Sequence, residues 1–149
     1  MNAADVAERF IFVRERPGTQ DNPYIQAWLE DAGLSIGSHD EVPWCGAFAK
    51  FIVGRCLGLP TPPLPARARS WLLMGVPTSN PQYGDVVVFK RGTGDQPGPN
   101  VLDAPGHVAF FLGWDSLSDY VRVVGGNQGN RVSAMSFPAR NVLGFRRMA

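Results

Sequence analysis

The sequence has little of what would assign a chain to several large classes of protein. It holds only two cysteines and two histidines, and its 14 basic and 13 acidic side chains leave a net charge of +1. Such a balanced charge gives no electrostatic reason to bind nucleic acid or an acidic membrane. The chain also lacks a basic run and an RNA-binding motif of aromatic and basic residues. We therefore expect no nucleic-acid partner.

Long apolar runs are missing as well. No apolar segment approaches the length that spans a membrane, and residues 1–5 do not resemble the start of a secretory signal. We expect no insertion into a membrane, and synthesis in the cytoplasm without a signal peptide. A length of 149 residues, 44% of them hydrophobic and 18% charged, is typical of one globular domain, residues 1–149, and we expect a monomer.

The few cysteines limit both disulfides and metal sites. Cys45 and Cys56 are eleven positions apart within one expected helix, so their sulfur atoms cannot meet in a disulfide. Zinc sites combine several closely spaced cysteines and histidines, and this chain has no such group. We expect neither a metal nor another cofactor.

The spacing of apolar residues predicts helices in the first half of the chain and strands in the second. A three-four spacing predicts helices over residues 3–15, 23–32, 44–57 and 66–74. Runs of β-branched and aromatic residues predict strands over residues 85–89, 107–112, 120–124, 131–136 and 141–147. This order predicts an α+β fold, with N-terminal helices packed on an antiparallel β-sheet.

Cys45 stands at the first turn of the expected helix 44–57. Backbone N–H groups at a helix start have no partner within the helix, and the helix dipole adds positive charge there. Both effects favour the thiolate, so Cys45 is a candidate nucleophile. Cys56 continues the apolar spacing of the same helix, and we expect it to be an inert core residue.

A cysteine nucleophile needs a base within hydrogen-bonding distance and a third group that orients the base. His39 lies in a polar stretch and is typical of an exposed loop residue, whereas His107 opens an apolar strand. If residues 107–113 and 120–126 pair as a hairpin, His107 lies across from Asn127 or the glycine before it. An amide there can orient the imidazole. An asparagine after two glycines is equally typical of a turn.

Four short motifs occur in an order that resembles a known family. They are PWCGAF at 43–48, GDVVVF at 84–89, GHVAF at 106–110 and GGNQ at 125–128. Together they resemble the CHAP/NlpC superfamily of papain-like peptidoglycan hydrolases, and more closely its compact bacterial and phage-associated members. Similar stretches at 22–25, 68–71 and 142–147 extend the resemblance over almost the whole chain.

The resemblance implies a papain-like fold of the CHAP/NlpC type that cleaves amide bonds in peptidoglycan. Carried over by position, Cys45 is the nucleophile, His107 the base and Asn127 the polar residue that orients the base. Many CHAP members have a glutamate near the third position, where this chain has two glycines. Gln128 therefore competes with Asn127 for the third role.

Further residues are candidates for contacts with a substrate. Those expected to bind substrate are Trp44, Gln128, Glu41 and Trp71, with a solvated loop acid as the alternative reading of Glu41 and a core position as that of the tryptophans. The backbone N–H of Cys45 is expected to stabilise the oxyanion. Its second donor is open between Asn22, Tyr24 and Trp44.

The sequence therefore predicts a cysteine hydrolase of peptidoglycan, either a stem-peptide endopeptidase or an N-acetylmuramoyl-L-alanine amidase. It would use a Cys-His-Asn triad and a thioester intermediate. Two alternatives stay open: an inactive wall-binding module of the same fold, and a cysteine amidase or peptidase with a substrate outside the wall. A protein made in the cytoplasm would act on the wall after release or delivery, and a delivery or immunity partner would fit that route.

Overall fold

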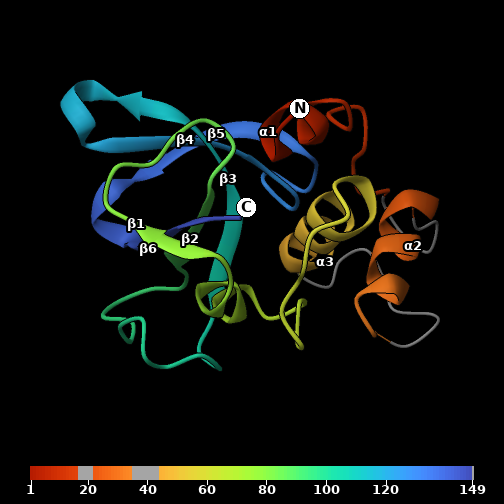
Figure 1. Ribbon diagram of the computed structural model, residues 1–149, viewed down its shortest axis with the longest axis horizontal. Helices are drawn as coiled ribbons and strands as arrows, with labels where there is room; N and C mark the ends of the chain where they lie inside the picture. Colours follow the sequence, from red (N-terminus) through yellow and green to blue (C-terminus); the bar gives the residue numbers. More distant parts are fainter. Residues whose placement is uncertain (17–21, 35–43, 149) are drawn as a thin grey trace.

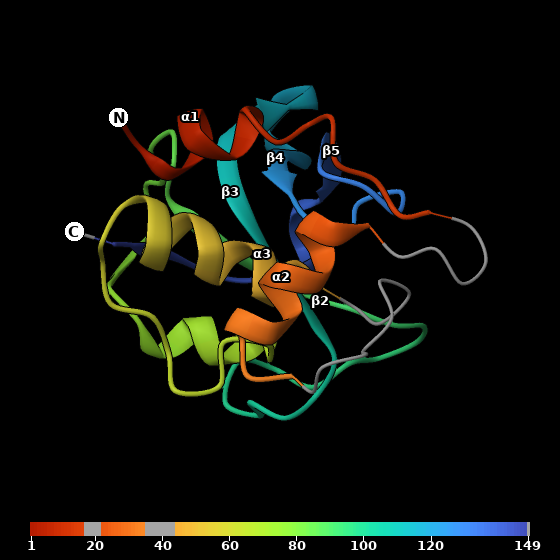
Figure 2. The same ribbon diagram turned by 90° about the vertical axis from the view of Figure 1, so that its right-hand side faces the viewer.

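The computed structural model of this chain describes residues 1–16, 22–34 and 44–148. In these ranges, short α-helices lie beside one six-stranded sheet in which all neighbouring strands are antiparallel. Figures 1 and 2 show the α-helices gathered on one side of the molecule and the sheet on the other. This arrangement confirms the α+β class and the packing of N-terminal helices on an antiparallel sheet.

The first two helices begin at residues suited to cap them. α1 (Ala3–Glu8) follows Asn2 and α2 (Pro23–Asp31) follows Asn22, and each asparagine side chain accepts a hydrogen bond from a backbone N–H of the first turn. Within the described ranges, no helix is both long enough and apolar enough to cross a membrane.

α1 ends earlier than the sequence predicts. The expected helix covers residues 3–15, whereas the observed one has six residues. The segment after it is held by hydrogen bonds to the turn after the fourth strand: Glu15 N–H donates to the carbonyl of Asn130, and Val132 N–H donates to that of Val13. Because backbone N–H and C=O groups of this segment already bond to the turn, they cannot also form the hydrogen bonds of a continued helix.

α3 (Cys45–Lys50) runs directly into a π-helical segment, η1 (Phe51–Cys56). Here the N–H of Leu57 bonds to the carbonyl of Ile52, five residues earlier, where an α-helix would bond four residues earlier. The wider turn changes which side chains face inward, and Cys56 is exposed. The prediction of Cys56 as a core residue is therefore wrong. Both cysteines are free, as expected.

Within the described residues, the sheet has six strands, and the longest connection between them is the loop from residue 91 to residue 105, between β2 and β3. They are β1 (Val76–Thr78), β2 (Val86–Lys90), β3 (Gly106–Asp115), β4 (Tyr120–Gly125), β5 (Ser133–Pro138) and β6 (Val142–Arg147), in the sheet order β1-β6-β2-β3-β4-β5. The sequence does not predict β1, because three residues that include a proline carry no alternating pattern. The remaining helical turns are 3₁₀: η2 (Ala68–Leu73), η3 (Ser116–Ser118) and η4 (Ala139–Asn141).

The sheet is curved, so that strands that are not neighbours touch. The ring centroids of Phe89 on β2 and Phe137 on β5 lie 5.1 Å apart, although β3 and β4 separate these strands. The concave face closes over a small core, whose buried members are Val87, Phe89, Ala109, Phe111, Val121 and Val123. The opposite face packs against the helices and buries the larger core.

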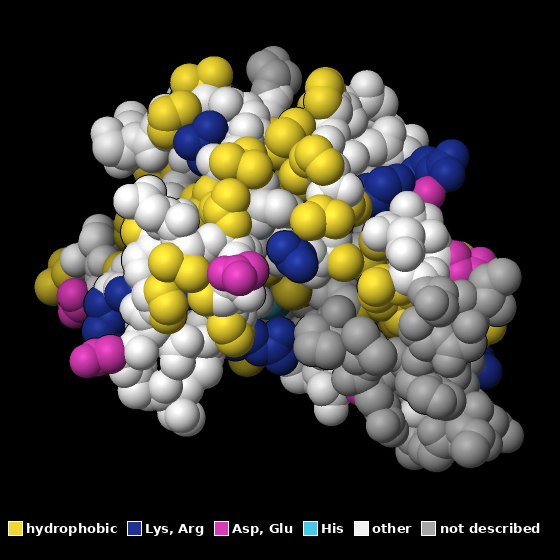
Figure 3. Space-filling view, turned by 90° about the horizontal axis from the view of Figure 1, so that it is seen from below, with side chains coloured by type: hydrophobic (Ala, Val, Ile, Leu, Met, Phe, Trp, Pro, Cys, Tyr) yellow, Lys and Arg dark blue, Asp and Glu magenta, His cyan; other side chains and the backbone are white. Residues whose placement is uncertain are grey.

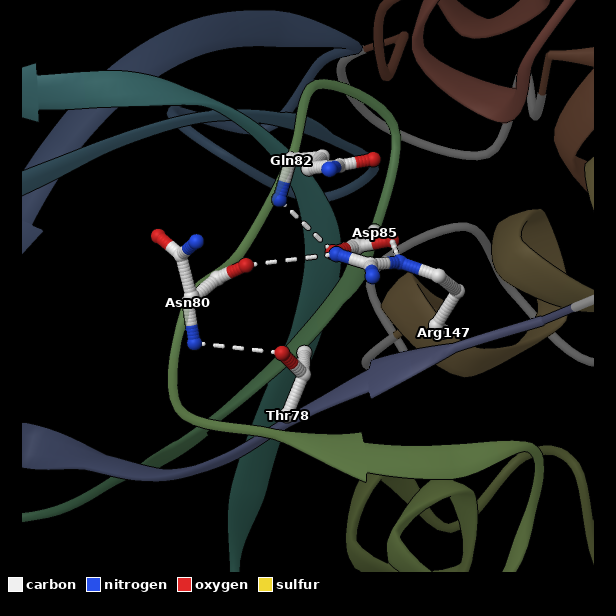
Figure 4. A network of polar contacts seen from close by, with 5 residues as sticks. All are labelled: Thr78, Asn80, Gln82, Asp85 and Arg147. Carbon is white, nitrogen blue, oxygen red and sulfur yellow. Dashed lines mark hydrogen bonds and ion pairs between the residues drawn. The ribbon is translucent and has the colours of Figure 1, made fainter.

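An ion pair joins the last strand to the turn before β2. The buried carboxylate of Asp85 accepts hydrogen bonds from Arg147 Nη2 at 2.7 Å, Arg147 Nε at 3.1 Å and the backbone N–H of Gln82 at 2.7 Å. Arg147 Nη2 also donates to the carbonyl of Asn80 at 3.2 Å (Figure 4). Asp85 and Arg147 both lie in stretches that carry the family resemblance, and their contacts here hold the sheet together.

The start of α3 lies directly against the turn after β4. At Gly126 of that turn, a Cβ atom would stand 2.7 Å from Trp44 Cζ3 and 2.8 Å from Phe48 Cβ. The ring of Trp28 lies 4.9 Å from that of Phe48 and 5.9 Å from that of Trp44. Such aromatic pairs contribute about 0.5–1.5 kcal/mol each beyond the area that they bury. They hold α3 against α2.

A methyl group at Gly126 should loosen this contact. We expect Gly126→Ala to lower the free energy of unfolding by about 1–3 kcal/mol, because neither Trp44 nor the backbone of α3 has room to move. Gly113→Ala is the matched control, since nothing lies within 4 Å of its added Cβ. Chemical denaturation of both variants measures the difference, and equal stability of the two would contradict the prediction.

Candidate active site

Cys45 is the first residue of α3 and meets the open side of β3. β4 pairs with β3 only from Phe110 onward, so the residues of β3 before it have a strand on one side alone. The backbone N–H of Val108, in this part of β3, lies near enough to the Cys45 sulfur to help lower the pKa of the thiol. The Cys45 side chain is 3% exposed. Gly46 leaves room for the carbonyl oxygens of residues 65 and 66, which lie against the start of the helix.

His107 is the second residue of β3, and its ring is held by two aromatic neighbours. The ring centroid of Phe89 lies 6.1 Å away at an interplanar angle of 28°, and that of Phe137 lies 5.3 Å away. His107 is 7% exposed, and its interaction with the nearby Cys45 side chain raises the pKa of the imidazole. The sequence-based prediction that His107 and Cys45 meet agrees with this geometry.

Gln128 is the third residue of a row of side chains that begins with Cys45 and His107. Its Oε1 lies 2.9 Å from Nε2 of His107, and its Nε2 donates to the carbonyl of Ser133 at 2.7 Å. The hydroxyl of Ser133 donates in return to the carbonyl of Gln128 at 2.8 Å. Because the amide NH₂ is committed to Ser133, the amide oxygen must face the histidine.

This orientation fixes the roles of the two imidazole nitrogens. An amide oxygen only accepts, so Nε2 of His107 carries a hydrogen and donates it to Gln128. Nδ1 is then the nitrogen that remains for the thiol of Cys45. The ring can accept the thiol proton on Nδ1 while Nε2 keeps its own, which is the arrangement that a cysteine nucleophile and its base require.

The pKa of the Cys45 thiol is lowered and that of His107 is raised. Burial acts the other way on both groups, since it favours a neutral thiol and a neutral imidazole. The opposite charge of the partner and the hydrogen bond between the two groups outweigh burial. The Val108 N–H lowers the thiol pKa further, and Gln128 raises that of the imidazole. Both shifts favour transfer of the thiol proton to the imidazole.

Gln128 occupies the place next to His107 that the sequence predicts for Asn127. The observed pairing of Phe110 with Val124 would, if continued, put Asn127 opposite His107, as expected from the hairpin. However, β4 stops before that point, and Asn127 has a φ of 57°, in the left-handed region that asparagine tolerates in turns. No described contact joins Asn127 to His107. Of the two residues that the sequence left in competition for this place, Gln128 is the one that contacts His107.

The other predicted binding residues do not line an open cleft over the thiol. Trp44 and Trp71 are fully buried, and Trp71 Nε1 donates to the carbonyl of Pro65 at 3.0 Å, so both are core residues and not contacts for a substrate. Glu41 and His39 lie outside the described residues. Gln128 is 2% exposed and acts on His107, which corrects its expected role as a substrate contact.

Two candidates for the second oxyanion donor are engaged elsewhere. Trp44 Nε1 donates to the carboxylate of Glu15 at 2.9 Å, and Asn22 Nδ2 donates to the carbonyl of Arg14 at 2.9 Å. Both contacts hold the N-terminal segment in place. The backbone N–H of Cys45, at the first position of α3, has no acceptor within the helix and remains available to an oxyanion.

Arg69 holds the loop that leads into His107, a role that the sequence did not indicate. This fully buried residue of η2 donates through Nε to the carbonyl of Pro105 at 2.9 Å. Its Nη1 lies within hydrogen-bonding distance of the carbonyls of Pro97, Gly98 and Val101, at 3.0, 2.7 and 3.2 Å. A single guanidinium thus gathers four carbonyls of the loop and sets the path of the chain into β3.

The described part of the chain contains no group of three or more His, Cys, Asp or Glu side chains placed to hold a metal ion.

No protein-family model, curated protein or solved structure matches this chain. The geometry of Cys45, His107 and Gln128, together with the resemblance of the sequence motifs, supports the function proposed below.

Replacement of Gln128 should weaken the thiolate, whereas replacement of Asn127 should not. In Gln128→Ala the imidazolium loses its acceptor, so we expect the pKa of Cys45 to rise and its alkylation at mildly acidic pH to slow severalfold. The rate of reaction with iodoacetamide as a function of pH measures this. Asn127→Gly is the control, because glycine keeps the left-handed backbone of position 127, and an equal effect of both substitutions would return the orienting role to Asn127.

Loss of the Arg69 side chain should release the loop. We expect Arg69→Met to lower the free energy of unfolding by about 2–4 kcal/mol, because several carbonyls of the loop lose the buried guanidinium that binds them. Limited proteolysis should then cut first within residues 97–105. Arg122→Met, at an exposed position of β4, is the control for loss of a charge. A protease-resistant loop in the Arg69 variant would show that other contacts hold it.

Proposed function

We propose that this protein is a cysteine hydrolase with a papain-like catalytic arrangement, and that it cleaves amide bonds in peptidoglycan. The observation that carries the proposal is the row formed by Cys45, His107 and Gln128, with the imidazole between the thiol and an amide oxygen. The choice of peptidoglycan is supported by the CHAP/NlpC resemblance of the four ordered motifs.

The reaction is acyl transfer. The Cys45 thiolate attacks the amide carbonyl, and the developing oxyanion lies near the free N–H at the start of α3. His107 gives the proton on Nδ1 to the leaving amine, which departs and leaves a thioester on Cys45. His107 then takes a proton from water, which attacks the thioester and releases the acid. Throughout, Gln128 keeps Nε2 occupied and the ring in one orientation.

The electrostatics favour an enzyme over an inactive binding module of the same fold. Placing a thiolate and an imidazolium in a buried position costs desolvation energy, which the pair only partly recovers. Strongly perturbed pKa values of this kind gather at sites that carry out chemistry. A module that only binds the wall would gain nothing from a buried ion pair at this position.

Substitution of the two cysteines provides the test. We expect Cys45→Ala to lower the hydrolysis of purified sacculi and of defined muropeptides by about 10³-fold or more, because the nucleophile is lost. Cys56→Ala is the matched control, since this exposed thiol lies on the same helical segment and away from the imidazole. Mass spectrometry of the released fragments identifies the bond that is cut.

Other outcomes would overturn the proposal. Unchanged hydrolysis by Cys45→Ala would exclude this thiol as the nucleophile. Binding of the unmodified protein to sacculi without release of new amino or carboxyl groups would favour the wall-binding module. Activity on other amides, with none on muropeptides, would favour a substrate outside the wall.

A further inference from the structure

Arg91 follows β2 at the end of the sheet that carries His107. β2 pairs with β3 so that Phe89 lies opposite His107, and continuing this register by one step places Arg91 level with Pro105. Side chains alternate along a strand, so Arg91 and Phe89 belong to the same face as His107. Diagonal neighbours on one face of an antiparallel pair lie about 7–8 Å apart. The side chain of Arg91 therefore leaves the backbone close to His107.

Arg91 is exposed and makes no hydrogen bond or ion pair with any described residue. Other arginines of the chain use their donors: Arg55 pairs with Asp31, and Arg147 pairs with Asp85. A guanidinium offers a planar set of donors that matches a carboxylate. At Arg91 this set is unused and lies at the rim of the site.

The surroundings of Arg91 do not neutralise it. The loop that follows contains Asp95 and Asp103, both exposed, and neither forms an ion pair with Arg91. Figure 3 looks at the underside of the view in Figure 1, where β3 begins, and shows Lys and Arg side chains among hydrophobic ones, with a few Asp and Glu side chains on the same face. This charge also reaches the catalytic pair. After the larger effects of burial and of the pair itself, Arg91 contributes to lowering the pKa of Cys45 and opposes the rise in that of His107.

We propose that Arg91 binds a carboxylate of the substrate next to the amide that Cys45 attacks, so that the enzyme prefers substrates with an acidic group beside the scissile bond. This inference rests on the proposed thiolate nucleophile but not on the wall as the substrate. In peptidoglycan it selects stem-peptide bonds flanked by a free carboxylate over the same bonds when the carboxylate is amidated.

Two small alkylating reagents test the proposal without a known substrate. Iodoacetate and iodoacetamide react at the same sulfur and differ in that iodoacetate carries a carboxylate. In a Cys56→Ala background, Cys45 is the thiol that remains, so the measured alkylation rate is the rate at Cys45. We expect Arg91→Gln to lower the ratio of the iodoacetate rate to the iodoacetamide rate about threefold to tenfold, because one favourable charge is lost. The ratio cancels any change in the fraction of thiolate.

Two further variants show whether the charge at position 91 is the cause. Arg91→Lys keeps a positive charge and should retain most of the ratio. Arg122→Gln removes an exposed arginine from β4 and should leave the ratio unchanged. An unaltered ratio in Arg91→Gln would overturn the carboxylate site while leaving Cys45 as the nucleophile. Failure of Cys45 to react faster than an ordinary thiol with either reagent would overturn the proposed function itself.

A pair of substrates that differ only in one carboxylate then tests whether the charge of Arg91 recognises that group. With a muropeptide that carries a free carboxylate beside the scissile bond, Arg91→Gln should raise KM and change kcat little. With the amidated form of the same muropeptide, the substitution should change neither. An equal rise in KM for both peptides would show that Arg91 does not read the carboxylate.

Discussion

The site depends on how closely α3 approaches the turn after β4, and the missing side chain of Gly126 sets that distance. The same turn holds Gln128, two positions later, and the same end of α3 holds Cys45. A contact between carbon atoms therefore fixes the separation of two polar groups that do not touch each other. The imidazole of His107 bridges them, and hydrogen bonds are lost when their partners move apart by a few tenths of an ångström.

The row of polar side chains is stable although it is buried, because each polar group in it has a partner in the next residue. The thiol meets the imidazole and the Val108 N–H, the imidazole meets the amide of Gln128, and that amide ends on the carbonyl of Ser133. In a low dielectric such a chain is stronger than in water, but an unpaired member would be costly. Phe89 and Phe137 keep water from the ring of His107 and so maintain the low dielectric.

The sequence predicted the features that follow from periodicity and failed where two local rules competed. Runs of β-branched and aromatic residues located the central strands, and the hairpin register brought His107 to the edge near residues 126–128. It could not choose between Asn127 and Gln128, because the choice depends on one left-handed residue at which the strand stops. The exposure of Cys56 was missed because a π-helical turn leaves no periodic signal. Arg69 was missed because carbonyl oxygens, its partners, belong to no residue type.

Arg69 anchors its loop in a way that does not depend on the identity of the side chains in the loop. The guanidinium binds backbone carbonyls, which every residue possesses, so the side chains at positions 97–101 are not needed for the anchor. Those positions can change identity over evolutionary time while the chain still enters β3 along the same path. Variation of the side chains in this loop therefore leaves the position of His107, two residues after Pro105, undisturbed.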